Sequence, residues 1–240
     1  MKNYYYYLRT VLFKFIFHLV PIKYLYSVID ILAVKESKNL FIGSKQISNN
    51  LKWNKKKIRF DVWDKFISKE NFTNQKIQFL EFGVYKGESI KYFAQKLLNK
   101  DNIFIGYDTF VGLPTDWQSA KKGMFSTDGK LPESDDNRIS FVKGIFQKTF
   151  DNTIIDKNIK TIIHFDADMY SSTLFLLFKL HEILDEYYFI FDELEGEELR
   201  ALKDYMKVYD IDLEISYYSK FNGLITVATG KIKKSNIFLQ

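Results

Sequence analysis

The chain has 240 residues, of which 46% are hydrophobic and 18% aromatic, and its formal net charge is +5. This length and composition suffice for one well-packed domain with an appendage, and they exclude a chain that is disordered throughout. The sequence contains no cysteine, which excludes disulfides, thiolate zinc sites and a cysteine nucleophile and agrees with a cytoplasmic location.

Basic residues dominate the first sixty positions. No Asp or Glu precedes Asp30, and none stands between Glu36 and Asp61. A basic surface favours an anionic partner, such as a nucleotide-sugar, a phosphorylated glycan, lipid headgroups or nucleic acid. A solvated, lysine-rich face explains the same charges equally well.

Residues 1–35 are expected to form two helical segments separated by Pro21. Basic residues interrupt the aromatic run before Pro21, so it falls short of the roughly 20 apolar residues that span a membrane. The run also lacks the small-residue cleavage site of a secretory signal. We expect these helices to pack on the domain or on a second copy in a homodimer. The alternative is peripheral contact of residues 1–35 with the inner face of the membrane.

From residue 60 onward, expected strands and helices alternate, after a polar linker at 36–60. The expected strands are 76–82, 103–108, 139–143, 161–165, 187–191, 211–217 and 223–229, and the expected helices are 61–68, 87–99, 172–183 and 196–208. This alternation predicts an α/β fold with a Rossmann-like, doubly wound, mostly parallel sheet of about seven strands. The predicted domain spans 61–240 and carries residues 1–60 as a basic helical appendage. The long loop at 110–138 is expected to be a lid over the active site.

The first of these strands runs into a turn with two glycines, in the pattern Glu81-x-Gly83-x-x-x-Gly87. Glycine lets the backbone turn sharply and approach a ligand closely. The spacing differs from the G-x-G-x-x-G of dinucleotide sites, and a carboxylate at Glu81 would repel a pyrophosphate. The pattern resembles motif I of class I S-adenosylmethionine (SAM) methyltransferases, and an ordinary strand-to-helix turn is the alternative. Asp108, which ends the next strand, can accept bonds from two ribose hydroxyls.

Acidic residues also follow two later strands. Asp166 and Asp168 come after the strand at 161–165, and Asp192 and Glu193 come after the strand at 187–191. Ligands of a doubly wound sheet lie at this edge. Carboxylates gathered there repel one another unless a cation or a shared proton intervenes, and oxygen ligands suit Mg²⁺. A helix-capping role explains Asp168 equally well.

Four stretches together resemble the macrocin O-methyltransferase family. They include D-T-F-x-G-L-P from Asp108 and D-x-D-x-Y-x-S-T from Asp166, and the resemblance covers about 76–210. It implies a class I SAM-dependent enzyme that methylates sugar hydroxyls, with Mg²⁺ in several members. Glu193 stands where that family has the second residue of an Asp-Asp pair.

The resemblance also implies roles for individual residues. Asp166 and Asp168 would be catalytic, and the metal ligands would be Asp166, Asp192 and Glu193. Asp168 ranks above His164 as a base because His164 falls inside a strand. The implied cofactor-binding residues are Glu81, Gly83, Tyr85, Lys86, Gly87, Ser89, Asp108, Thr109, Phe110 and Gly144.

The sequence therefore predicts a SAM-dependent O-methyltransferase assisted by a divalent metal. Its acceptor would be a nucleotide-sugar, a surface or capsular glycan, or a glycosylated natural product. One alternative keeps the fold but methylates RNA or another small molecule. It is disfavoured for nucleic acid because the chain contains no recognisable RNA module. The other alternative is a non-catalytic protein that binds a membrane surface.

Overall fold

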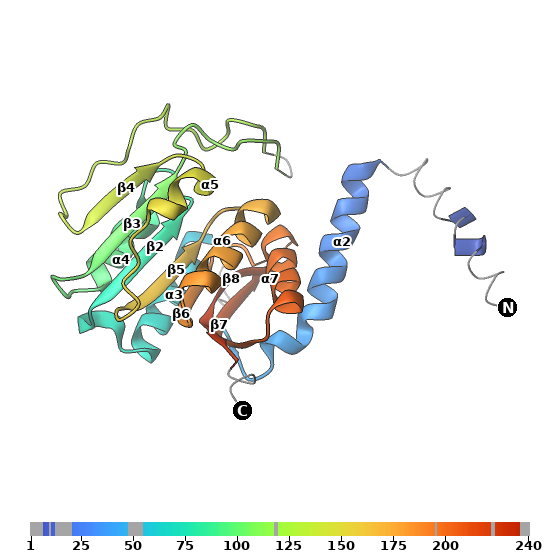
Figure 1. The fold of residues 1–240 in the computed structure, drawn as a ribbon. Helices are drawn as coiled ribbons and strands as arrows, with labels where there is room; N and C mark the ends of the chain where they lie inside the picture. The colour runs from blue at the N-terminus through green and yellow to red at the C-terminus, as the bar shows by residue number, and fades with distance from the viewer. Residues whose placement is uncertain are drawn as a thin grey trace.

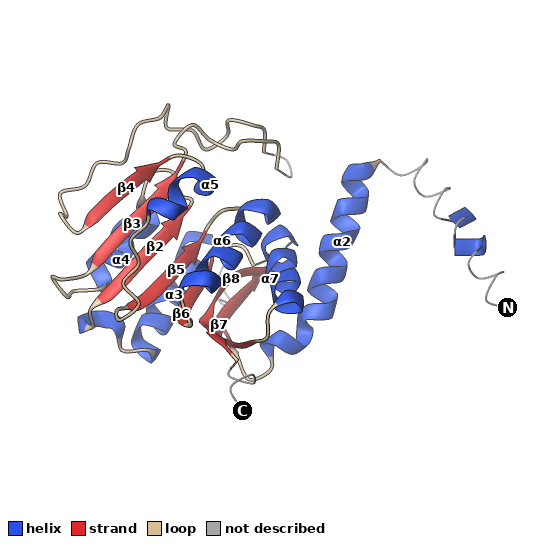
Figure 2. Ribbon diagram, viewed as in Figure 1, coloured by secondary structure: helices blue, strands red, loops and turns tan. Residues whose placement is uncertain are grey.

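The computed structural model describes residues 7–9, 11–12, 21–47, 55–117, 120–194, 196–221 and 224–235. The expected helical segment before Pro21 lies largely outside these residues. Within them, one mixed sheet has helices on both faces (Figures 1 and 2). This arrangement confirms the predicted Rossmann-like α/β fold.

The sheet contains eight strands, in the order β1-β7-β8-β6-β5-β2-β3-β4. Their bounds are β1 (Lys45–Gln46), β2 (Ile77–Phe82), β3 (Ile103–Asp108), β4 (Ile139–Lys143), β5 (Lys160–Phe165), β6 (Glu186–Phe191), β7 (Ile211–Phe221) and β8 (Leu224–Lys234). Only β8 runs antiparallel to its neighbours. The strand beyond the expected seven is β1, a two-residue edge strand formed within the predicted linker.

Helices cover the sheet in two groups. Their bounds are α2 (Ile22–Glu36), α3 (Lys55–Lys69), α4 (Glu88–Lys96), α5 (Phe146–Thr149), α6 (Tyr170–Ile183) and α7 (Gly196–Val208), with short 3₁₀ turns at Ser37–Phe41, Phe72–Asn74 and Phe150–Asn152. One core joins α6 and α7 to one sheet face, and a second core joins α3 and α4 to the other.

Strand β2 contributes side chains to both cores. Successive side chains of a strand point to opposite faces. Leu80 and Phe82 accordingly belong to the core under α6 and α7, whereas Ile77 and Phe79 belong to the core under α3 and α4. All six β2 residues are buried, as expected for a strand in the middle of a parallel sheet.

Helix α3 is longer than the sequence indicates. It begins at Lys55 rather than at residue 61, and its Val62, Trp63 and Phe66 are fully buried. The helix therefore forms one layer of the domain and brings the end of the predicted appendage against the sheet.

The order in which strands are added to the sheet reverses between β2 and β5. From β2 it adds β3 and then β4 on one side, and it then returns to place β5 and β6 on the other side. In such sheets the crevice beyond the carboxyl ends of the two central strands is the usual ligand site. The predicted site residues after β2, β3, β5 and β6 all lie at this edge.

Candidate functional site

A cavity of about 540 Å³ lies at the carboxyl ends of β2, β3, β5 and β6. Gly83, Asp108, Asp166 and Asp192, each directly after or at the end of a strand, line it. The loop at 110–138 contributes Leu113, Pro114, Trp117 and Phe125, among others. The prediction that this loop covers the strand ends agrees with these positions.

Gly83 forms the closest contact in the cavity wall. Its φ is +97°, and a Cβ at this position would lie 1.8 Å from the backbone oxygen of Asp166. The N–H of Asp166 donates to the carbonyl oxygen of Phe82 at 2.9 Å. The end of β2 thus touches the first residue after β5 through main-chain atoms, and only glycine fits there.

The carboxylate of Asp108 holds the turn after β2. Its Oδ2 accepts hydrogen bonds from the N–H groups of Val84 and Tyr85, each at 2.8 Å. Its Oδ1 accepts a bond from the N–H of Phe110, also at 2.8 Å. The Thr109 hydroxyl lies 3.4 Å from Oδ1 of Asp108 and 3.1 Å from the carbonyl oxygen of Gly112. When its single proton goes to Gly112, three of the roughly four lone-pair sites of the Asp108 carboxylate are used, and one is left for a ligand hydroxyl in the cavity.

The predicted cofactor-binding residues fall into two sets. Gly83, Tyr85, Asp108 and Thr109 line the cavity. Lys86, Gly87, Ser89, Phe110, Gly144 and Glu81 are not among the residues that line it. Several residues of the second set lie next to residues of the first set and hold their backbone in place.

Three residues of the second set show this support. The N–H of Gly144 donates to the carbonyl oxygen of Asp108 at 2.9 Å. Gly87 precedes α4 in a left-handed conformation, and Phe110 is buried with φ of +57°. Their direct contact with a cofactor stays a prediction.

Glu81 lies inside the sheet rather than at its edge. Its side chain is 1% exposed, and its Oε1 lies 3.0 Å from Nδ1 of the fully buried His164. Burial, followed by the nearby Asp166 carboxylate, raises the pKa of Glu81 well above its usual value. Burial lowers the pKa of His164 to about 3. His164 is therefore neutral at neutral pH, and the pair is a buried hydrogen bond beneath the cavity.

Arg59 is a cavity residue that the sequence analysis did not identify. Its Nη1 donates to Oδ2 of Asp192 at 2.7 Å, and its side chain is 15% exposed. Its guanidinium carbon lies 5.0 Å from the centre of the Trp63 ring. Burial alone would lower the pKa of Arg59, but the carboxylates of Asp192 and Asp166 outweigh burial and raise it. The guanidinium is thus a permanent positive charge in the cavity wall.

The expected metal site does not fit this arrangement. Asp166, Asp192 and Glu193 all line the cavity. However, within the part of the chain that the structure describes, no three His, Asp or Glu side chains are arranged to hold a metal ion. Asp192 instead forms an ion pair with Arg59. A guanidinium supplies the charge that a divalent cation was expected to bring, so the prediction of Mg²⁺ is not supported.

Acids at the start of α7 also organise the site, and the sequence analysis did not single them out. Oε2 of Glu197 accepts the N–H of Tyr170 at 2.7 Å, and Oε1 of Glu198 accepts the N–H of Ala167 at 3.3 Å. These bonds hold the loop that carries Asp168, which has φ of +59° and lines the cavity. The sequence signal for these two residues is Gly-Glu-Glu at 196–198, which places two acids in the first turn of a helix.

Glu198 is 2% exposed. Burial, with the carboxylates of Asp168 and Asp166 adding to it, raises the pKa of Glu198 well above its usual value. Its carboxyl group therefore favours the protonated form in the folded protein. Protonation removes one negative charge from a region that already holds several carboxylates.

Comparison with known proteins identifies the architecture. No protein-family model and no curated protein matches the sequence, so membership of the macrocin family stays a prediction. Among solved structures, the calicheamicin methyltransferase CalS11 is 18% identical with a TM-score of 0.50, and the match covers 85% of this chain and 91% of that one. The O-methyltransferase NovP is also 18% identical with a TM-score of 0.50, over 76% of this chain and 79% of its own.

Substitution of Gly83 by Ala separates backbone strain from overlap at the cavity wall. We expect Gly83→Ala to lower the free energy of unfolding by about 1–3 kcal/mol for the left-handed conformation and by a further ~1–3 kcal/mol for the overlap with Asp166. The control is Gly43→Ala, because Gly43 has φ of +85° with no atom within 4 Å of the added Cβ. Urea unfolding of both variants measures the difference, and equal losses would contradict the close contact at Gly83.

Replacement of Glu198 by Gln tests the protonated carboxyl. The raised folded-state pKa means that the stability contribution of Glu198 is complete below pH of about 4.5 and is lost as the pH rises toward its folded-state pKa. Glutamine stays neutral and retains an acceptor for the Ala167 N–H. We therefore expect Glu198→Gln to raise the unfolding midpoint at pH 8 and to have less effect at pH 4.5. The exposed Glu133→Gln is the control, and a midpoint difference that shrinks with rising pH would refute the assignment.

The fold and the site arise together from the close contact of β2 with β5. Around that contact the structure gathers a carboxylate fixed by backbone N–H groups, a permanent cation and several further carboxylates. The chain has the Rossmann-like fold found in the methyltransferases CalS11 and NovP.

Proposed function

We propose that the cavity binds SAM and that the protein methylates a hydroxyl group of a sugar. The observation that carries the proposal is the Asp108 carboxylate, which three backbone N–H groups fix at the cavity. It accepts from the two residues after Gly83, whose own backbone packs directly against Asp166 in the cavity wall. The similarity in fold to CalS11, a calicheamicin methyltransferase, and to NovP, an O-methyltransferase, supports the same reaction class.

The residues of the cavity fit this cofactor. Its volume, about 540 Å³, lies within the roughly 300–1,000 Å³ of small-molecule sites. Asp108 would accept the ribose hydroxyls, and the apolar side chains of Ile145 and Phe146, which also line the cavity, would cover the adenine. Carboxylates at the other end offer a favourable environment for a positive sulfonium.

Bound SAM supplies a methyl group whose carbon–sulfur bond breaks as an acceptor oxygen bonds to the carbon. The chain orients the acceptor and takes its proton. Asp168 and Asp166 line the cavity, and a carboxylate there removes the hydroxyl proton as the oxygen becomes a nucleophile. Arg59, held by its ion pair with Asp192, places a positive charge in the same part of the cavity wall as these carboxylates. No step uses a metal ion, because Asp192 is already paired with the guanidinium.

The acceptor class is a sugar hydroxyl on a nucleotide-sugar, a surface glycan or a glycosylated natural product. The sequence motifs that resemble the macrocin O-methyltransferase family support this acceptor class. Holding the acceptor oxygen in line with the transferred methyl group supplies most of the rate advantage in such a transfer, and the lid residues Pro114 and Trp117 are placed to exclude water.

Loss of the Asp108 carboxylate should abolish cofactor binding. In the unaltered protein, S-adenosylhomocysteine at about 100 times its dissociation constant should add about 2.7 kcal/mol of stability. At about 2–4 °C per kcal/mol for a chain of this size, the midpoint should rise by roughly 5–11 °C, and NAD should cause no rise. We expect no shift for Asp108→Ala. The control is Asp101→Ala, an exposed residue before β3, which should retain the full shift. A full shift in Asp108→Ala would overturn the ribose assignment.

Removal of the Asp168 charge should separate catalysis from binding. Asparagine tolerates the left-handed backbone of position 168, so Asp168→Asn should fold and keep the S-adenosylhomocysteine shift. We expect methyl transfer to fall by about 10²–10⁴-fold. The measurement is release of S-adenosylhomocysteine from SAM with a panel of nucleotide-sugars and glycosides, and undiminished turnover in the variant would exclude Asp168 as the base.

A further inference from the structure

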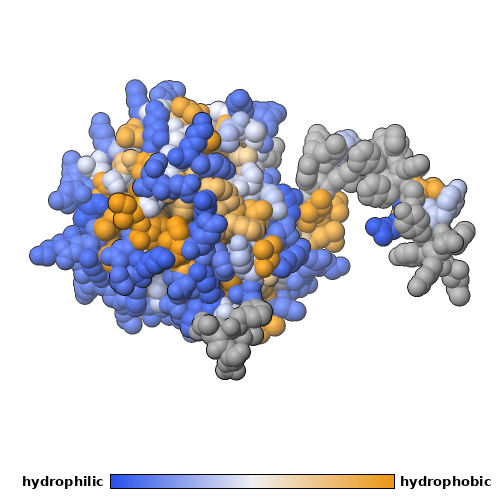
Figure 3. Space-filling view, in the orientation of Figure 1, coloured by the Kyte–Doolittle hydropathy of each residue, from blue (hydrophilic) through white to orange (hydrophobic). Residues whose placement is uncertain are grey.

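The outer face of α2 is apolar and exposed. Val28, Ile29, Ile31 and Leu32 are each between 44% and 62% exposed. Helical geometry places these residues and Lys35 on one side of the helix. Figure 3 shows hydrophobic atoms at the right-hand edge of the domain, where Figure 1 places α2. Four exposed aliphatic side chains on two turns form an unusual surface for a protein that faces only water.

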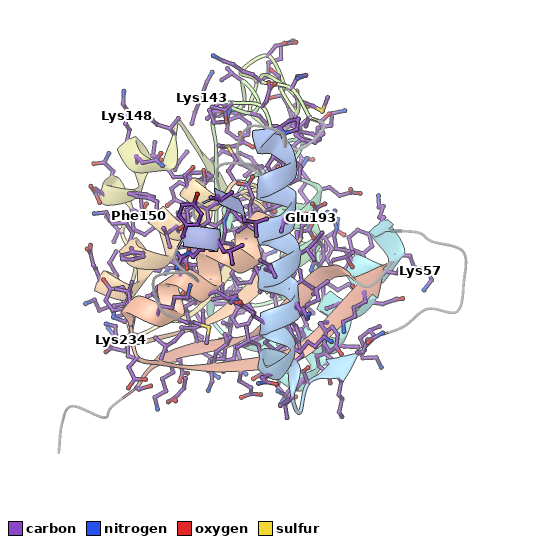
Figure 4. The ribbon with its side chains drawn as sticks, turned by 90° about the vertical axis from the view of Figure 1, so that its right-hand side faces the viewer. Lys57, Lys143, Lys148, Phe150, Glu193 and Lys234 are labelled. Carbon is purple, nitrogen blue, oxygen red and sulfur yellow. The ribbon has the colours of Figure 1, made fainter. Side chains whose placement is uncertain are left out.

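The opposite face of α2 is already used. Ala33 is buried, as is Ser37 directly after the helix, and Val34 packs against the core under α6 and α7. Glu36 lies at the end of the outer side, seven residues after Ile29, and forms an ion pair with Lys203 of α7. Figure 4 shows α2 standing in front of the rest of the domain when this side faces the viewer. The helix is therefore held on the domain by one face and presents the other outward.

The net charge of the protein is concentrated on the same segment. Residues 1–47 contain seven Lys and Arg against two acidic residues, which leaves 28 of each in residues 48–240. The whole excess of +5 thus lies in the segment that contains α2, and the remainder is neutral. Residues 48–60 add five Lys and Arg and no acid, so the basic region continues into α3. Its charge directs the N-terminal part of the chain toward an anionic surface.

The described residues before α2 also expose apolar side chains, beside Arg9. Tyr7, Leu8, Val11 and Leu12 are between 48% and 67% exposed. No helix among the described residues combines the length and apolar character needed to cross a membrane. Exposed apolar side chains beside basic residues are the composition of a helix that lies on a bilayer.

We propose that the outer face of α2 docks on an anionic lipid bilayer. Val28, Ile29, Ile31 and Leu32 enter the boundary between headgroups and acyl chains, and the basic residues of positions 1–47 contact the lipid phosphates. Both contributions are needed, because one weak apolar anchor gives only marginal binding and electrostatic attraction fades within about 10 Å at 0.1 M salt. The proposal is independent of the reaction in the cavity.

The test is sedimentation of the full chain with vesicles, without any ligand of the cavity. We expect binding to vesicles of phosphatidylglycerol and phosphatidylcholine, little binding to pure phosphatidylcholine, and a loss of binding as salt rises. The double variant Ile31→Glu/Leu32→Glu should reduce the partition constant at least about tenfold.

A matched control introduces the same change of charge at exposed positions away from α2. Leu98 and Ile154 are 61% and 88% exposed and lie outside the basic segment, so Leu98→Glu/Ile154→Glu should bind vesicles within about twofold of the unaltered protein. Equal losses of vesicle binding in both double variants would show that net charge alone causes the loss, and this result would overturn the proposed docking face. Failure of the unaltered protein to bind anionic vesicles would also overturn it.

A dimer would explain the same face differently. Light scattering in solution should show the same mass for the unaltered protein and for Ile31→Glu/Leu32→Glu. A dimer that this variant converts to a monomer would identify the face as a contact between copies of the chain and would refute the lipid proposal.

Discussion

The contact between the ends of β2 and β5 determines the geometry of the site. Gly83 meets the carbonyl group of Asp166 with no room for a Cβ, so the two strands touch backbone to backbone where they end. Beyond that point the chain continues toward β3 on one side and toward β6 on the other. The crevice opens there because the connections diverge, and Asp108, Asp166 and Asp192 take their positions from it.

Negative charge at this edge is balanced in two ways. Arg59 pairs with Asp192, and burial favours the protonated forms of Glu81 and Glu198 by raising their pKa values. A buried carboxylate without either kind of compensation is costly. The site can therefore hold many acids in a small volume.

Much of the fold was predictable because periodicity and strand ends are local signals. Strands β3 and β4 were predicted with the bounds that the structure has, and α7 was too. Glu81 was less well placed. Its position inside β2 puts it on the face of Ile77 and Phe79, opposite His164 in the register of β5, so its side chain points into a core rather than to the edge.

Arg59 could not be predicted in the same way. It stands 133 residues before its partner Asp192, on a helix that the sequence pattern began two residues too late to include it. Only the packing of α3 on the sheet, through Trp63 and Phe66, brings the guanidinium to the strand ends. Glu198 was obscured for a related reason, since an acid in an amphipathic helix is usually solvated, and its burial depends on how α7 meets α6.

The glycine at the wall of the cavity has an evolutionary consequence. A surface made of main-chain atoms keeps its shape while the surrounding side chains are replaced, provided that one position stays glycine. Selection on such a wall acts on a single residue, and drift elsewhere leaves it intact. The fold shared with CalS11 at 18% identity shows that one architecture can be built from very different side chains.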